Sequence, residues 1–334
     1  MGKPRIGVIG TGGTLSSIGR HPLDLIEYPD TGIKLTAEEV LERWPVAHEV
    51  AEVVAIPYRA VGSMQIGPED WLALVRLIQK TAEEDPELAG FVITHGTAST
   101  EETAYFLNLV LTVPQAVVVV GAQRPTSGLG TDAGINLVNA IRTAAHPETR
   151  EMGVVVMLND EIQAAREVTK TSTLRMHTFR SPDVGVLGHA DADAIVYYRT
   201  PRRARAPNTE LALNLDSVET LPRVDIAYAY AGTDGAAVRA FVDAGAAGIV
   251  SAGFAPGGTT AAETDALEAA AAAGVCVVQA SRAGSGRVTQ RANLTAKGFI
   301  AAGNLNPQKA RVLLMVALSH TRDPQAVARL FDTY

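Results

Sequence analysis

Runs of apolar residues rich in valine and isoleucine recur along the chain and alternate with segments whose apolar positions repeat at helical spacing. Short continuous apolar runs predict buried strands. They lie at residues 5–10, 52–56, 90–95, 116–122, 153–158, 225–231, 247–253 and 275–280. Strands that are apolar on both faces are typical of a parallel sheet covered by helices on both sides, so the pattern predicts an α/β fold.

Helix starts are marked between several of these runs. A hydroxyl residue followed by glutamate three positions later is typical of a capping box, in which the two residues satisfy each other's backbone amides. The candidates are Thr36 with Glu39, Ser99 with Glu102, and Thr260 with Glu263. Proline favours the first helical position, so another helix is expected to begin at Pro68. Its apolar face comprises Trp71, Leu74, Val75 and Ile78.

The periodic pattern weakens between residues 199 and 223, where prolines and arginines accumulate. Such a stretch between two periodic regions indicates a connecting segment. We therefore expect a larger N-terminal α/β domain over residues 1–200, a linker over 201–222 and a smaller C-terminal α/β domain over 223–334.

Charge narrows the class of partner. The chain has 36 acidic and 29 basic side chains, a formal charge of -7, without a long run of either sign. This balance disfavours nucleic acid and anionic membranes as ligands and favours a small molecule. The sequence has no pattern of a secretory leader and no apolar stretch long enough to span a bilayer, so we expect a cytoplasmic protein.

The first candidate for chemistry is the turn "GVIGTGGTLSS" after the first strand. It lacks the third glycine of the dinucleotide fingerprint, which weakens a nicotinamide interpretation. Glycines here could instead serve as a structural turn, or let a ligand approach the backbone and present the hydroxyl of Thr14 at the carboxyl end of a strand.

A second strand end, "FVITHGT", offers Thr97 in front of a helix N-terminus, where backbone amides can stabilise an oxyanion. Two strand-end threonines suit nucleophilic acyl transfer if a base can deprotonate one of them. His95 is one candidate base, although a histidine at a strand end also suits a packed, hydrogen-bonded role. Lys170 in "EVTKTST" is a stronger candidate, because a lysine drawn into a crevice loses its charge readily.

Taken together, the motifs "IGTGGTL", "VITHGTASTEETAYFL", "VVVVGAQRP", "LNDEIQAAREVTKTST", "TFRSPDVGVLG" and "LNPQKARVLL" resemble those of the bacterial-type L-asparaginase family. They occur in the family's order and cover nearly the whole chain. The resemblance implies a large N-terminal and a small C-terminal α/β domain, no cofactor and no metal. It also implies a homotetramer in which each site borrows residues from a neighbouring subunit.

The resemblance also implies roles for single residues. Thr14 matches the family's nucleophile, Thr97 its second catalytic threonine and Lys170 the lysine paired with it. Tyr28 matches the tyrosine of a mobile loop that assists the first threonine, and Ser63 matches the serine that holds the substrate's α-carboxylate. The expected substrate-binding positions are Gly13, Ser63, Met64, Gly96, Ala98 and Asn293.

Departures from the family pattern concentrate on one substrate group. Ala98 replaces the aspartate that binds the α-ammonium, and Met64 replaces the glutamine that follows the carboxylate-binding serine. Pro256 falls where a neighbouring subunit contributes an asparagine, and Asn293 falls near a family glutamate. A buried cation without such partners costs several kcal/mol, so asparagine is expected to bind poorly.

The sequence therefore predicts an amidohydrolase that uses a threonine nucleophile on a linear amide. Its substrate would be a small carboxylate without the α-amino group, such as the dicarboxylic monoamides succinamate or maleamate. Two alternatives stay open: an ordinary L-asparaginase with substituted ligands, and a non-catalytic binding protein on the same fold.

Overall fold

The computed structural model describes residues 2–334 and divides into two compact units between Thr209 and Glu210. This division lies inside the segment 201–222. The end of the first unit is tied to its own core, because the Ala206 amide donates to Asn108 O at 2.9 Å and the Thr209 hydroxyl donates to Leu109 O at 2.6 Å. Residues up to Thr209 are thus held by the first unit rather than free.

An eight-stranded sheet forms the centre of the first unit, in the order β10-β9-β6-β5-β4-β3-β1-β2. Strands β1 to β5 are parallel, as expected, whereas β6, β9 and β10 extend the sheet in antiparallel fashion. A separate two-stranded ribbon pairs β7 with β8. The strands are β1 (Arg5–Gly10), β2 (Glu52–Ile56), β3 (Leu88–Thr94), β4 (Ala116–Val120), β5 (Val154–Leu158), β6 (Glu161–Ala164), β7 (Thr169–Lys170), β8 (Phe179–Arg180), β9 (Gly188–Ala190) and β10 (Ile195–Tyr197).

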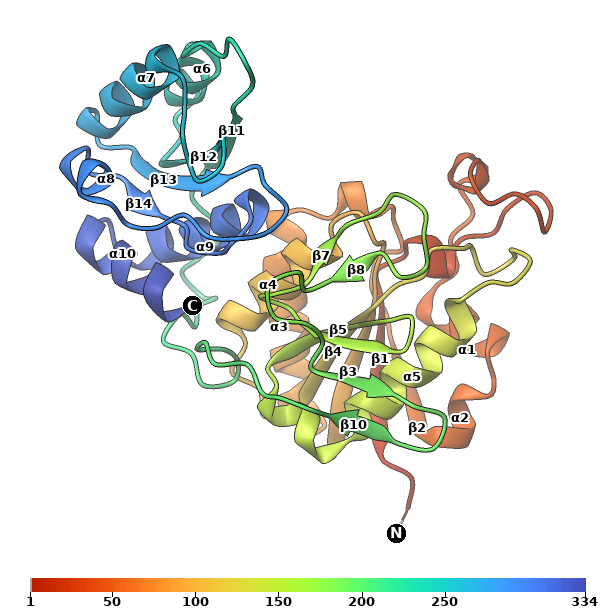
Figure 1. The fold of residues 1–334 in the computed structure, drawn as a ribbon. Coiled ribbons are helices and arrows are strands. Elements are labelled where there is room, and N and C mark those ends of the chain that lie inside the picture. Colours follow the sequence, from red (N-terminus) through yellow and green to blue (C-terminus); the bar gives the residue numbers. More distant parts are fainter. Residues whose placement is uncertain (1) are drawn as a thin grey trace. The chain divides into compact units, whose positions relative to one another are not determined.

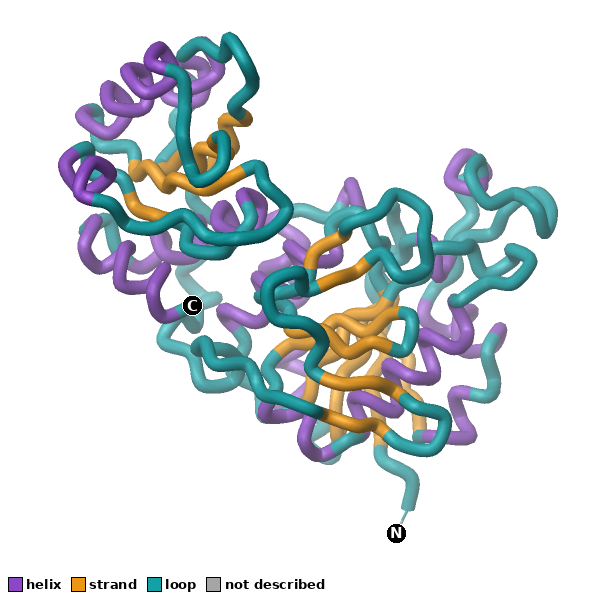
Figure 2. Tube along the Cα trace, in the orientation of Figure 1, coloured by secondary structure: helices purple, strands orange, loops and turns teal. Residues whose placement is uncertain are grey.

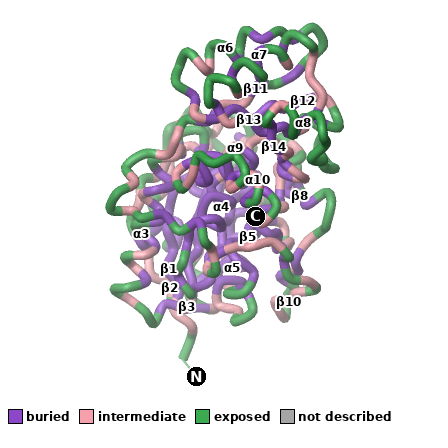
Figure 3. Tube along the Cα trace, turned by 90° about the vertical axis from the view of Figure 1, so that its left-hand side faces the viewer, coloured by how far each residue is buried: buried purple, intermediate pink, exposed green. Residues whose placement is uncertain are grey.

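Helices cover both faces of this sheet, with α5 on one face and α3 and α4 on the other (Figure 1). Leu137 and Ile141 of α5 pack in one apolar cluster with Val92 and Val118 of the central strands. The α-helices are α1 (Ala37–Arg43), α2 (Ala47–Val50), α3 (Pro68–Glu84), α4 (Thr100–Val110) and α5 (Ala133–Ala145), and the 3₁₀ turns are η1 (Thr14–Ser16), η2 (Tyr28–Thr31), η3 (Ser63–Gln65) and η4 (Pro147–Glu151). The central strands are buried throughout (Figure 3), so the fold class predicted from their apolar runs is confirmed.

Of the three expected capping boxes, the one at Thr36 forms, whereas those at Ser99 and Thr260 differ from the prediction. The capping box at Thr36 and Glu39 forms in both directions. At Ser99 the helix begins as expected but the predicted cap is wrong, because the Ser99 hydroxyl donates to Ser63 O at 2.7 Å instead. A tertiary partner, invisible in the local sequence, has taken the hydroxyl away from the helix end.

The second unit contains a four-stranded parallel sheet in the order β11-β12-β13-β14, with apolar residues of α6, α7 and the strands in one cluster. Loops connect these elements around the sheet (Figure 2). The elements are β11 (Val224–Tyr228), α6 (Ala236–Asp243), β12 (Gly248–Gly253), α7 (Ala261–Ala272), β13 (Cys276–Ser281), α8 (Ala292–Ala296), β14 (Ile300–Ala301), α9 (Pro307–His320) and α10 (Pro324–Thr333).

Helix α7 holds a buried carboxyl group. Thr260 caps the helix by accepting from the Glu263 amide at 3.2 Å, but the Glu263 side chain does not return the bond, so only half of the predicted capping box forms. Glu263 is 1% exposed, and neither carboxyl oxygen has a hydrogen-bond partner within residues 2–334. Burial therefore raises the pKa of Glu263 above its ordinary value.

A raised pKa means that the folded chain prefers the neutral carboxyl. The free energy of unfolding is then highest below the ordinary glutamate pKa and falls as pH rises toward the shifted one. We expect Glu263→Gln to increase the unfolding free energy at pH 7 by about 1 kcal/mol, with the gain shrinking near pH 4. Urea denaturation at both pH values measures this. Asp265→Asn, an exposed acid on the same helix, controls for net charge, and a destabilised Glu263→Gln protein would contradict the expectation.

Candidate active site

Three loops meet at the carboxyl edge of the large sheet. They follow β1, β2 and β3 and carry Gly13, Ser63 and Gly96. A Cβ atom added to Gly13 would lie 2.3 Å from Gly96 Cα, and one added to Gly96 would lie 2.7 Å from Ser63 Cβ. Gly13 also has a φ of 79°, which favours glycine. The two glycines are therefore needed for the close approach of these loops.

The first hydroxyl in this crevice belongs to Thr14, which begins the turn η1. Its Oγ1 lies 2.7 Å from the hydroxyl oxygen of Tyr28, and either atom can be the donor. Tyr28 begins η2 in a segment whose base is fixed near Thr14, because Leu35 N donates to Ser16 O at 2.7 Å. The structure thus places Tyr28 directly against Thr14.

The second hydroxyl belongs to Thr97, which is 6% exposed and lies between β3 and α4. Lys170 Nζ donates to Thr97 Oγ1 at 2.7 Å. Lys170 comes from the two-residue strand β7, which is not part of the main sheet. A lysine distant in sequence therefore reaches one particular threonine.

The Lys170 side-chain amine makes no ion pair within 4.0 Å among residues 2–334. Burial lowers the pKa of Lys170 from its ordinary value. A neutral amine next to a hydroxyl can accept its proton, so the pair has the arrangement of a general base with its substrate or relay group.

Ser63 is buried beneath the crevice and its hydroxyl accepts from the Ala98 amide at 3.3 Å. Ala98 itself is exposed, and the adjacent Met64 is 89% exposed. The Ser99 hydroxyl secures the same loop through Ser63 O. The positions beside Ser63 and Thr97 thus present a methyl group and a thioether rather than an amide and a carboxylate.

An ion pair between the exposed Arg59 and the buried Asp70, which sequence reasoning missed, supports the Ser63 loop. Asp70 accepts from Arg59 Nε at 2.7 Å, from Arg59 Nη2 at 2.6 Å and from the Gly67 amide at 3.0 Å. Arg59 also donates to Gln65 O at 2.9 Å. Burial alone raises the pKa of Asp70, but these hydrogen bonds outweigh it and leave that pKa below its ordinary value. The sequence showed only an acidic residue in a helix's first turn.

His95 is enclosed by hydrogen bonds and does not face Thr14. It is fully buried, with Nδ1 2.8 Å from Gly96 O and Nε2 3.0 Å from Thr103 Oγ1. Burial lowers its pKa to about 4 despite the bond to Gly96 O. The packed role considered for this histidine therefore fits its surroundings.

Because the pKa of His95 is lowered in the folded chain, the free energy of unfolding should depend on pH in the acid range. Since its folded pKa is depressed, its contribution to stability is complete above pH 6.5 and is lost as pH falls from about 6.5 toward 4. We expect the unfolding free energy to decline across this window. NMR titration should find one of the seven histidines uncharged down to about pH 4; an imidazole set that titrates entirely near pH 6.5 would contradict this.

Two of the substituted positions lie in the second unit. Asn293 is exposed in α8, and Pro256 is exposed in the turn that follows β12. Both positions are described within the second unit alone, so the substrate-binding roles expected at Asn293 and Pro256 stay predictions.

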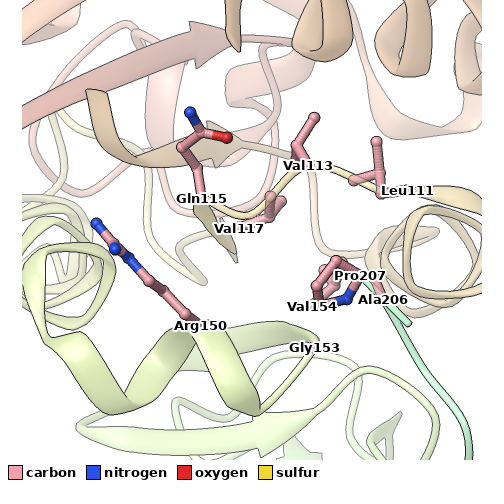
Figure 4. A pocket seen from close by; sticks show the side chains of 9 residues that line it. All are labelled: Leu111, Val113, Gln115, Val117, Arg150, Gly153, Val154, Ala206 and Pro207. Atoms are coloured by element: carbon pink, nitrogen blue, oxygen red, sulfur yellow. The ribbon is translucent and has the colours of Figure 1, made fainter. Parts of the chain in front are cut away.

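One cavity lies at the other edge of the large sheet. Gln115, Val117, Gly153 and Val154 line it near the amino ends of β4 and β5 (Figure 4). Its volume of about 10 Å³ suits a single water molecule. It is therefore not a substrate site.

Within residues 2–334, no group of three or more histidine, cysteine, aspartate or glutamate side chains is arranged to hold a metal ion. None of the helices in this range has the length and hydropathy needed to cross a bilayer.

Comparison with protein families matches both parts of the chain. Residues 5–203 match the model "Asparaginase, N-terminal", and residues 223–331 match "Glutaminase/Asparaginase C-terminal domain". Together these matches cover most of the chain.

Individual relatives agree with the family match. The chain is 39% identical over 336 residues to L-asparaginase 2 of Escherichia coli, covering 100% of this chain and 94% of that protein. It is 38% identical to the probable periplasmic L-asparaginase of Haemophilus influenzae over 99% and 93% of the two chains. A glutaminase-asparaginase of Pseudomonas fluorescens is 33% identical over 98% and 90%. The crystal structure of a probable cytoplasmic L-asparaginase from Campylobacter jejuni has a TM-score of 0.91 and 35% identity, covering 99% and 100%.

Proposed function

The chain belongs to the asparaginase family of amidohydrolases, and from this premise we propose that it hydrolyses the amide of a small carboxylate without an α-amino group. Thr14 would act as the nucleophile. Succinamate and maleamate are representative substrates, since each joins a carboxylate to a linear amide through a short carbon chain.

The observation that carries this proposal is the pair of apolar side chains beside Ser63 and Thr97. Ala98 and Met64 offer no side-chain acceptor for an ammonium group, and the Lys170 amine makes no ion pair among residues 2–334. Once the site is covered, a substrate ammonium placed here would lose its hydration without gaining a partner, at a cost of several kcal/mol. A methylene group at the same place has no such cost.

The reaction would proceed in two stages. The Thr14 hydroxyl, with its proton passed toward Tyr28 at 2.7 Å, attacks the amide carbon and forms an ester as the C–N bond breaks. Ammonia leaves after gaining a proton, and backbone amides near the start of α4 stabilise the oxyanion. Water then attacks the ester while Thr97 and the Lys170 amine take its proton. The ester C–O bond breaks, Thr14 Oγ1 takes up that proton, and the dicarboxylate is released.

Ammonia release by the purified protein tests the proposal. The substrates are succinamate, maleamate, L-asparagine and L-glutamine, with Thr14→Ala as the control that keeps the fold but lacks the nucleophile. Turnover of an amino-free amide that greatly exceeds that of asparagine and disappears in Thr14→Ala is the expected result.

An ordinary L-asparaginase is the second candidate, because a relative that is 39% identical carries that name. Faster turnover of asparagine than of every amino-free amide would support it and overturn our proposal. Binding of these acids without ammonia release, unchanged in Thr14→Ala, would favour a binding protein.

The assembly and location follow from the same family resemblance. We infer a cytoplasmic homotetramer with sites completed at subunit interfaces, since Met64 stands open to solvent in the single chain and a dry subsite needs a cover. Light scattering coupled to size-exclusion chromatography would give the mass of the assembly, and a monomer would contradict the inference.

A further inference from the structure

We propose that Glu101 is a positioning residue that holds Lys170 within reach of Thr97. The inference rests on the proposed function and assigns a role to a side chain to which the family resemblance gave none. Glu101 lies in the first turn of α4 and is 5% exposed. Its Oε1 accepts from the Lys170 amide at 3.2 Å and from the Thr169 hydroxyl at 3.0 Å.

The strand that carries Lys170 needs such support. β7 is two residues long and pairs with β8, so no backbone pairing with the main sheet fixes its position. An isolated two-stranded ribbon is marginally stable by itself. In Figure 1 the ribbon of β7 and β8 lies near α4, the helix whose first turn contains Glu101.

Hydrogen bonds join the ribbon to the rest of the unit both next to β8 and at β7. On the β8 side, Ser181 donates to Gln163 Oε1 of β6 at 2.7 Å. On the β7 side, Glu101 accepts from both Thr169 and Lys170. Thr97 and Glu101 are four residues apart at one helix start, so a single rigid segment carries both the hydroxyl and the anchor of its lysine.

The role depends on acceptor geometry. Leucine at position 101 would remove both acceptors and leave the part-buried Lys170 amide without the Glu101 bond. Glutamine keeps one carbonyl oxygen that can accept, so it should restore part of the support. Because a displacement of about 1 Å at a reacting group can reduce rates a hundredfold, loss of the anchor should lower kcat more than it changes KM.

The experiment compares wild type, Glu101→Leu, Glu101→Gln and Glu102→Gln, the last a matched acid in the same helix turn. For Glu101→Leu we expect kcat to fall at least about thirtyfold with KM changed less than about threefold. Glu101→Gln should recover most of kcat, and Glu102→Gln should match wild type.

Hydrogen exchange of the peptide covering residues 165–181 gives a second measurement that needs no turnover. Exchange at least about tenfold faster in Glu101→Leu than in Glu102→Gln would support the anchor. Unchanged exchange, or a Glu101→Gln protein with kcat as low as that of Glu101→Leu, would overturn it. If wild type releases no ammonia from any substrate, the proposed function fails, and the exchange result still decides whether Glu101 holds the ribbon.

Discussion

Lys170→Met should lower kcat for the amino-free amide by about a thousandfold. Methionine approximates the length of the lysine stem but has no amine, so Thr97 Oγ1 would lose the partner that lies 2.7 Å away. A positioned general base contributes about 10² to 10⁴ in rate, which sets the size of the loss. The measurement is steady-state ammonia release at the pH optimum of the wild type.

Lys34→Met is the matched control for this prediction. Lys34 is also a part-buried lysine whose Nζ donates to a hydroxyl, that of Ser17 at 3.0 Å, and burial also lowers its pKa. We expect its replacement to change kcat less than about tenfold, because Lys34 has no contact with Thr97 that could transfer a proton. If Lys170→Met retained kcat within tenfold of wild type, Lys170 would not be the base.

Ala98→Asp should shift the selectivity toward L-asparagine by at least about a hundredfold in the ratio of kcat/KM values. An aspartate next to Thr97 supplies an anionic acceptor for an α-ammonium, and a charged pair in such a site is worth several kcal/mol. The new negative charge should also raise the pKa of Lys170, so the acid limb of the pH profile should move to higher pH.

Ala98→Asn separates the charge from the size of this substitution. Asparagine adds similar volume and an amide oxygen but no charge, so the acid limb should stay near its wild-type position. An Ala98→Asp protein with an unchanged selectivity ratio would show that other groups recognise the region around Cα of the substrate. That result would remove the main argument for an amino-free substrate.

The amino-acid sequence by itself determined the architecture. Continuous apolar runs predicted the parallel strands β1 to β5, because a strand buried on both faces needs an apolar residue at nearly every position. The motif glycines were also readable, since Gly13 and Gly96 lie where the backbones of two strand-end loops touch. The match to both asparaginase family models agrees with the resemblance drawn from the same motifs.

Only the tertiary structure decided those partners that neither the sequence patterns nor the family resemblance named. The resemblance paired Lys170 with Thr97 across 73 residues, but Glu101, which accepts from the Lys170 amide, has no local signature of that role. The Ser99 hydroxyl, predicted to cap its own helix, instead bonds to Ser63 O, 36 residues away. Periodicity and motifs record burial and backbone geometry near one position, whereas a hydrogen bond between distant side chains exists only after the topology brings their loops together.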